Sequence, residues 1–379
     1  MPVTTAAYAT DTLPGGTVDT VVIGGGAAGL NGALMLARSR RSVVVIDSGT
    51  PRNAPAEGVH GLLGLDGTPP AELYERGREE VRRYGGVIVS GEVASAEPAA
   101  PSALPASSAS SASSASSASS TSSASSAEGD PSAGNAPSTE ATPPAEGDPR
   151  FTVTLADGRT LTARRLLVAT GLRDVLPDIP GLAEHWGHGV VHCPYCHGWE
   201  VRDEPIGVLA VGPASVHHAL LFRQLTDDLV YFTRGTELDE DTRTRFAARD
   251  IRVVDTPVEE VVRADDGGIA GVRLADGQVV ARSVLAVATL MRARTEGLEG
   301  LGLPIEDLPD GMGRRFAAGM AGATEVPGVW VAGNATDPTA QVGAAAAAGA
   351  LAGAHINALL AIADTDAALA AAKSGATAV

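Results

Sequence analysis

The sequence predicts an α/β fold built from two similar units. One strand–turn–helix–strand pattern opens at Val21, and a second opens at Ile206. After each pattern the tetrapeptide Leu-Ala-Asp-Gly, at 155–158 and again at 274–277, leads into an apolar strand. Short β-rich runs that alternate with helical stretches are typical of parallel sheets covered by helices. We therefore predict two Rossmann-like, three-layer ββα nucleotide-binding domains of one ancestry; chance recurrence of the tetrapeptide is the alternative.

The composition is that of an acidic chain with aliphatic cores. Its 379 residues include 28 Lys and Arg against 45 Asp and Glu, a net charge of -17, and 3% aromatic residues. A chain this negative would repel a phosphate backbone, so we expect no nucleic-acid partner. No run of about 20 residues is continuously and strongly apolar, and the N-terminus lacks a signal-peptide pattern. We expect no membrane span and a cytoplasmic location.

A low-complexity segment of Ser, Ala, Pro, Gly and Glu runs from Glu97 to Pro149. Few of its side chains could be buried usefully, so we predict that it is disordered. Its flanks, 87–89 and 151–155, are β-rich, and we interpret them as neighbouring strands of one sheet. Because loop-closure entropy grows only logarithmically with length, we predict an expendable insertion inside a domain rather than an interdomain linker.

The first turn has the pattern of a dinucleotide-binding loop. The strand 20–23 enters Gly-Gly-Gly-Ala-Ala-Gly at 24–29, and a helix follows to Arg38. The next strand, 43–46, ends at Asp47. Strand, loop, helix, second strand and terminal acid are all present, which makes the pattern far more specific than the glycines alone. A glycine-rich turn without a ligand is the alternative.

Each residue type in this loop has a physical reason. Gly24 allows the tight turn, Gly26 lets a diphosphate approach the backbone, and Gly29 lets the helix pack on the strand. The helix N-terminus presents unpaired N–H groups and a partial positive charge to the phosphates. Asp47 would accept hydrogen bonds from a ribose. The predicted cofactor contacts of this region also include Ala27, Ala28, Ser48, Arg52 and Asn53.

The two cysteines of the chain, Cys193 and Cys196, form a C-x-x-C motif. Such a pair serves redox cycling or supplies half of a zinc site. No second pair exists in the sequence, so we expect no metal, and two ordinary buried thiols are the remaining alternative. We favour redox cycling, in which one sulfur attacks and its neighbour resolves the intermediate. His197 could shuttle a proton or stabilise a thiolate there, whereas His192 is expected to be structural.

Together these motifs resemble those of the low-molecular-weight thioredoxin reductase family of flavoproteins. The resemblance covers nearly the whole chain apart from the serine-rich segment. It is carried by the glycine loop, by the cysteine pair with His197-Gly198, and by 169–171, 177–181 and 329–334. It implies that FAD binds the first domain, that Cys196 faces the flavin, and that Cys193 engages an outside disulfide or dithiol. It also implies a homodimer.

The resemblance implies the rest of the FAD site as well. Asn334 stands where the family usually has Asp, and its amide can still bond a hydroxyl. A helix that begins near Gln341 and runs to Ala354 would point its N-terminus at the flavin; a plain core helix is the alternative. The tail after Ala363 is expected to be frayed. The implied contacts are Ala169, Thr170, Gly171, Gly333, Asn334, Gln341 and Val342.

The sequence departs from the family at two places. His197 replaces the Asp that usually follows the second cysteine. The second nucleotide loop, 212–217, has Pro213 where a glycine would expose an N–H, and the basic cluster for a 2′-phosphate is reduced to Arg234. NADPH binding is therefore doubtful. His60 is expected to be a surface histidine rather than a residue of the redox pocket.

These features predict an FAD-dependent thiol/disulfide oxidoreductase. The departures are similar to those of the FAD-dependent dithiol oxidases of the gliotoxin and holomycin type, which implies oxidation of a small-molecule dithiol with O2 as acceptor. The alternatives are an NADPH-dependent thioredoxin-disulfide reductase, with a thioredoxin-like protein as partner, and a flavoprotein-like module without turnover. We predict a discontinuous FAD domain at 1–181 and 292–379, and a cysteine-carrying, pyridine-nucleotide-binding-like domain at 182–291.

Overall fold

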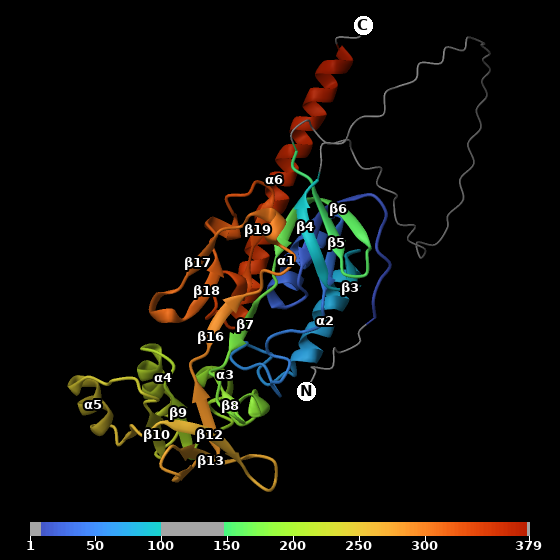
Figure 1. Ribbon diagram of the computed structural model, residues 1–379. Coiled ribbons are helices and arrows are strands. Elements are labelled where there is room, and N and C mark those ends of the chain that lie inside the picture. Colours follow the sequence, from blue (N-terminus) through green and yellow to red (C-terminus); the bar gives the residue numbers. More distant parts are fainter. Residues whose placement is uncertain (1–8, 100–147, 377–379) are drawn as a thin grey trace, which may run out of the picture.

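The computed structural model describes residues 9–99 and 148–376. Most of the predicted insertion, 97–149, therefore lies outside the described residues. Figure 1 shows the helices and strands gathered in two lobes, connected by extended strands.

A seven-stranded sheet forms the larger lobe. Valine and isoleucine side chains fill its parallel strands almost continuously, as expected for a sheet covered on both faces. Along the sheet the order is β3 (Val87–Ser90), β2 (Val43–Asp47), β1 (Thr17–Ile23), β6 (Thr160–Val168), β5 (Phe151–Leu155) and β4 (Val93–Pro98), and β19 (Val329–Val331) also pairs with β6. Strands β4 and β5 are antiparallel to their neighbours, and the others are parallel. This confirms the first strand–turn–helix–strand pattern.

The flanks 87–89 and 151–155 do belong to one sheet, as predicted, but they are not neighbouring strands. Strand β3 lies at the edge of the sheet beside β2, whereas β5 pairs with β4. Strand β4 was not predicted, because its sequence Val-Ala-Ser-Ala-Glu-Pro has little apolar content and is held in place by pairing with β5. The predicted insertion is also too long, because Glu97 and Pro98 belong to β4 and Asp148 is bound by Arg164 and Arg165.

Three helices cover the larger sheet, and two of them cross at very close range. They are α1 (Ala27–Arg38), α2 (Pro70–Arg83) and α6 (Val342–Ala376). A Cβ at Gly349 would lie 1.9 Å from the carbonyl oxygen of Ala28, and one at Gly353 would lie 2.6 Å from that of Gly32. The small residues therefore allow the α1 and α6 backbones to touch. This contact fixes the N-terminus of α1, where the glycine loop ends.

Helix α6 differs from the sequence expectation in two ways. It continues past Ala363 rather than fraying, because Asp364 accepts hydrogen bonds from Arg41 and Arg164 at its side. Among the described residues there is also one helix, 342–374, whose length and apolar composition would allow it to cross a membrane; its mean hydropathy is 1.6. This corrects the expectation that no such run exists. Core helices pass the same test, and the first half of α6 packs on α1 through Ala352 and Ile356.

The smaller lobe repeats the parallel pattern. Its five parallel strands lie in the order β11 (Arg252–Val254), β10 (Leu229–Phe232), β9 (Ile206–Leu209), β15 (Val284–Val287) and β8 (Val190–Val191). The accompanying helices are α3 (Pro194–His197), α4 (Ala214–Phe222) and α5 (Glu240–Ala247). A meander of β12 (Val258–Arg263), β13 (Ile269–Leu274) and β14 (Val279–Ala281) packs beside them. The second strand–turn–helix–strand unit is confirmed.

The chain passes between the lobes along two strands that pair with each other. Strand β7 (Leu172–Val175) leads out and β16 (Leu290–Ala293) returns, antiparallel to it. Two further strands, β18 (Gly313–Phe316) and β17 (Ile305–Asp307), extend this small sheet. Short 3-10 turns occupy Ala183–His185, Glu299–Leu301, Pro309–Gly311, Met320–Gly322 and Gly333–Ala335. The domain limits at 181 and 291 remain a prediction.

Candidate active site

A cavity of about 530 Å3 opens where β1, β2 and β6 end. Most of the residues predicted from the sequence line it, although they come from segments far apart in the chain. These are Gly24, Gly26, Ala27, Ala28, Asp47, Ser48, Arg52, Asn53, Ala169, Thr170, Gly171, Cys196, His197, Asn334, Gln341 and Val342. Gly29, Cys193 and Gly333 are not part of the lining.

Two glycines of the loop, Gly24 and Gly29, are packed tightly against backbone, whereas Gly26 borders open space. A Cβ at Gly24, whose φ is +108°, would lie 2.3 Å from the carbonyl oxygen of Ala169. One at Gly29 would lie 1.8 Å from that of Gly24. At Gly26 a Cβ would meet nothing within 4 Å, so this backbone faces the open cavity at the start of α1. The loop therefore fits the diphosphate of a dinucleotide.

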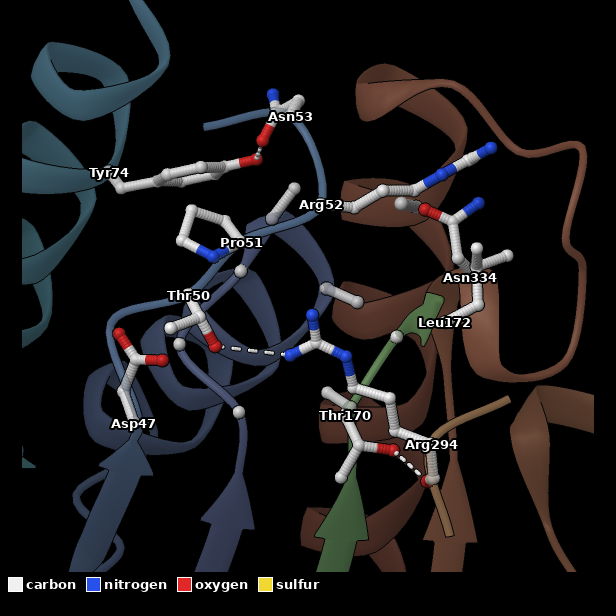
Figure 2. Close-up of a pocket in the computed structure, with 18 of the residues that line it drawn as sticks. Asp47, Thr50, Pro51, Arg52, Asn53, Tyr74, Thr170, Leu172, Arg294 and Asn334 are labelled. Carbon is white, nitrogen blue, oxygen red and sulfur yellow. Dashed lines mark hydrogen bonds between the residues drawn. The ribbon is translucent and has the colours of Figure 1, made fainter. Parts of the chain in front are cut away.

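Asp47 and Asn53 border the cavity on the side of β2. Asp47 ends the strand, is buried, and accepts a hydrogen bond from the backbone N–H of Gly49 at 3.2 Å. The hydroxyl of Tyr74 donates to Oδ1 of Asn53 at 3.0 Å, as Figure 2 shows. Burial raises the pKa of Tyr74, so it stays a neutral donor. These contacts give the wall a fixed set of acceptors beside the loop.

The contacts of Asn334 give a reason for an amide at the position where the family usually has Asp. Its Nδ2 group donates to the carbonyl oxygens of Asp337 at 3.1 Å, Pro338 at 3.2 Å and Ala340 at 2.8 Å. An aspartate at this position could not donate to three carbonyl oxygens. The amide thus folds the segment that leads into α6, and Gln341 and Val342 at the start of that helix line the cavity.

The cysteines form a disulfide that closes one end of the cavity. Cys193 and Cys196 are bonded, with their Cα atoms 5.2 Å apart, around the short helix α3. Cys196 lines the cavity and Cys193 does not. This arrangement agrees with the implied division of labour, in which Cys196 faces the cofactor.

His197 lies beside this sulfur as an unpaired imidazole. Among the described residues, neither of its ring nitrogens has a hydrogen-bond partner, although both are buried. Burial lowers the pKa of His197, the carboxylate of Glu200 opposes that shift, and His60 and Arg52 add to it. A neutral imidazole with a free nitrogen is suited to accept a proton from a thiol.

His60 lines the wall of the cavity, although it was expected to be a surface histidine. Its Nε2 lies 3.3 Å from Oε1 of Glu200, and its Nδ1 lies 3.5 Å from Oδ2 of Asp66. This corrects the expectation. No local signal in the sequence marked His60, because its partner Glu200 follows the cysteine pair 140 residues later in the chain.

A buried chain of polar contacts connects Arg52 to the residue before Cys193. Arg52 donates two hydrogen bonds of 2.7 Å to Asp174, and the hydroxyl of Thr289 donates to the same carboxylate at 2.6 Å. Burial raises the pKa of Asp174, but the bonds from Arg52 lower it below the usual value. Nδ1 of His192 lies 3.0 Å from the carbonyl oxygen of Val287 and 3.2 Å from the backbone nitrogen of Thr289. These contacts hold the His192 ring in place, in keeping with the structural role expected for it.

The second nucleotide loop satisfies its own polar groups. The N–H of Val211 donates to Oγ of Ser215 at 3.0 Å, and Pro213 has no N–H. Arg234 turns back and donates to the carbonyl oxygen of Ala210 at 2.8 Å. One loop N–H and one Arg234 donor are thus engaged within the protein, and Pro213 offers no N–H to a pyridine nucleotide.

Fold and site together define an FAD-type thiol/disulfide oxidoreductase: a dinucleotide loop and a redox disulfide share one cavity. A family model described as pyridine nucleotide-disulphide oxidoreductase matches residues 18–350. The chain belongs to this family, and it is an FAD-dependent disulfide oxidoreductase of the thioredoxin reductase-like type.

Individual relatives extend the comparison over nearly the whole chain. The thioredoxin reductase tcpT of Claviceps purpurea (strain 20.1) is 32% identical over 304 residues, covering 78% of this chain and 79% of that protein. The crystal structure of HlmI is 41% identical with a TM-score of 0.78, covering 97% of this chain and 100% of that one. An oxidoreductase from Agrobacterium tumefaciens is 31% identical with a TM-score of 0.73, covering 91% and 99%.

Proposed function

We propose that the protein oxidises a small-molecule dithiol to a disulfide through Cys193 and Cys196, with FAD as cofactor and O2 as the final electron acceptor. The observation that carries the direction is the second nucleotide loop. Val211 donates its N–H to Ser215, Arg234 is turned back onto the carbonyl oxygen of Ala210, and Pro213 supplies no donor. With NADPH poorly accommodated, electrons enter from the thiol side.

The exchange with substrate takes place at Cys193. A substrate thiolate attacks Sγ of Cys193, which forms a mixed disulfide and releases Cys196 as a thiolate. The second substrate thiol then displaces Cys193, so the substrate leaves as a disulfide and the cysteine pair is reduced. Two electrons pass from the substrate to the pair, the proton of the second substrate thiol goes to Cys193, and that of the first goes to His197 beside the Cys196 thiolate. His197 accepts the proton of the incoming thiol, because its imidazole is neutral and its nitrogens are free.

Reoxidation of the pair takes place at Cys196, which lines the cavity. The glycine loop at Gly26 and the wall residues Asp47 and Asn334 would hold FAD there. When bound, FAD supplies the capacity to accept an electron pair and to pass it to O2, which yields hydrogen peroxide. The buried imidazole of His197 remains beside Cys196 to take up and release the thiol proton.

Anaerobic titration of the purified flavoprotein tests the proposal. Dithiothreitol should bleach the flavin absorbance, NADPH in a separate cuvette should not, and hydrogen peroxide should appear when air is admitted. The Cys196→Ser variant should bind FAD and resist bleaching by dithiol. Rapid bleaching by NADPH followed by turnover of a thioredoxin disulfide would instead make the protein a reductase, in keeping with the name of the thioredoxin reductase tcpT.

Two expectations from the sequence remain proposals. The resemblance to the family supports a homodimer, and the composition supports a cytoplasmic location. Sedimentation velocity of the flavoprotein would decide the first.

A further inference from the structure

We propose that Arg294 binds the diphosphate of FAD and that Thr170 positions it for this contact. Neither role was predicted from sequence, where Arg294 was not a candidate and Thr170 was expected to contact the cofactor itself. The inference does not depend on the direction of electron flow.

Arg294 is the one arginine of the cavity wall without an ion-pair partner in the part of the chain that the structure describes. Three arginines line the cavity. Arg52 is paired with Asp174 at 2.7 Å and Arg173 with Glu296 at 2.6 Å. Within 9–99 and 148–376, no carboxylate oxygen lies within 4.0 Å of the Arg294 guanidinium. Its positive charge is therefore available to a ligand.

The backbone of Arg294 is fixed to the end of β6. Its N–H donates to the carbonyl oxygen of Gly171 at 3.0 Å, and its carbonyl oxygen accepts from the hydroxyl of Thr170 at 2.8 Å. The Thr170 hydroxyl is thus used by the protein rather than presented to a cofactor. Because the two bonds fix the peptide units on both sides of the Arg294 Cα, the side chain leaves the returning segment in a set direction.

The side chain spans the site from one strand end to another. Figure 2 shows Arg294 reaching from beside Thr170 toward Thr50. Nη1 of Arg294 donates a hydrogen bond to Oγ1 of Thr50 at 3.2 Å. Thr170 follows β6 and Thr50 follows β2, and β1 lies between these strands in the sheet. The end of β1 carries Gly24 and Gly26, so the guanidinium lies near the loop that a diphosphate approaches.

The guanidinium also has a buried donor that nothing satisfies. Nε of Arg294 is buried without a hydrogen-bond partner among the described residues. Burial and the neighbouring Arg173 lower the pKa of Arg294, and the carboxylates of Glu296, Asp47 and Asp174, which lie beyond ion-pair distance, oppose that shift only in part. A buried cation is costly unless an anion accompanies it. The diphosphate is the anionic part of oxidised FAD, and its oxygens match the planar donor fork of arginine.

Titration of the flavin-free protein tests the assignment, with flavin fluorescence quenching for FAD and riboflavin and calorimetry for ADP. For Arg294→Gln the dissociation constants of FAD and ADP should both rise about 10- to 100-fold, the loss expected for a hydrogen bond to a charged group. The dissociation constant of riboflavin, which lacks the diphosphate, should not change. Arg294→Lys should recover part of the loss, and Thr170→Val should weaken FAD and ADP binding less than Arg294→Gln does.

Arg314→Gln is the control, because this arginine is paired with Asp307 at 2.9 Å and does not line the cavity. Its FAD and ADP affinities should stay at the wild-type level. The assignment is overturned if Arg294→Gln weakens riboflavin and FAD equally, or leaves ADP unchanged. If that variant does not fold, as judged by circular dichroism, Arg294→Lys decides: unchanged binding of all three ligands at low and high salt would overturn the assignment.

Discussion

Arg52 and Asp174 are joined by two hydrogen bonds of 2.7 Å, although 122 residues separate them in the chain. The guanidinium comes from the loop after β2, and the carboxylate belongs to β7, the strand that leaves the larger lobe. Thr289, just before the returning strand β16, donates to the same carboxylate. The contact therefore connects the cofactor cavity to both strands that connect the lobes, and through Thr289 to His192 beside the disulfide.

Asp174→Asn should lower the free energy of unfolding and slow electron transfer from the cysteine pair to the flavin. The change leaves the half-buried Arg52 charge without its partner, and breaking such a buried pair costs about 3 kcal/mol or more of unfolding free energy. It should also slow bleaching of the flavin by dithiothreitol, since His192 loses its indirect support. Urea unfolding and stopped-flow absorbance measure the two effects. The control, Glu296→Gln at an exposed pair, should change stability by less than about 1 kcal/mol; equal losses in both variants would contradict the prediction.

Removal of Glu200 should shift the acid limb of dithiol oxidation to lower pH. His197 acts as a base only when neutral, and burial already lowers its pKa below 6.5. The Glu200 carboxylate raises that pKa, so Glu200→Gln lowers it further, and activity persists into more acidic solution. The pH profile of anaerobic flavin bleaching measures the shift. Glu184→Gln, at an exposed carboxylate, should leave the profile in place; a shift of the Glu200→Gln limb toward higher pH would refute the assignment of His197.

His218 should make the fold sensitive to mild acid. Burial lowers its pKa from the ordinary 6.5 to about 4, because the ring lies against Phe222 away from water. Between these values the unfolded chain binds a proton that the folded chain does not, so stability falls as pH falls from 6.5 to 4, by up to about 3 kcal/mol. His218→Gln keeps a donor for the carbonyl oxygen of His192 and should flatten the dependence. Urea unfolding midpoints of the wild type and of His218→Gln at pH 7.5 and 5 measure this dependence. An equal loss of stability in the two proteins at pH 5 would contradict the role of His218.

Residues 100–147 of the serine-rich segment should be removable, whereas the ends of the predicted insertion, including Asp148, should be needed for stability. The N–H of Ala99 donates to the carbonyl oxygen of Arg150 at 2.8 Å, so the two flanks already lie side by side. Replacing 100–147 by a short glycine turn should leave flavin content and melting temperature unchanged. Asp148→Asn should cost about 3 kcal/mol or more, since Asp148 accepts from Arg165 at 2.6 Å in a buried pair. A colourless product from the 100–147 replacement, with Asp148 kept, would contradict the first expectation.

The sequence alone determined the two strand–turn–helix–strand units and the chemistry of the two motifs. The glycine loop, the strand ending at Asp47 and the C-x-x-C pair are local patterns, because each depends on spacings of a few residues that the backbone itself enforces. For the same reason Pro213 could be recognised as a departure from its position in the loop alone. The pattern also identified two parallel units, which the two sheets confirm.

Only the tertiary structure decided how charged groups pair. Arg52, which was predicted to contact the cofactor, lines the cavity and is paired with Asp174, whereas Arg294 was not considered and has no ion-pair partner among the described residues. His60 meets Glu200 across 140 residues, and β4 was recognised only through its pairing with β5. Hydrogen bonds and ion pairs between distant residues depend on where packing brings each side chain, and no local spacing encodes that position.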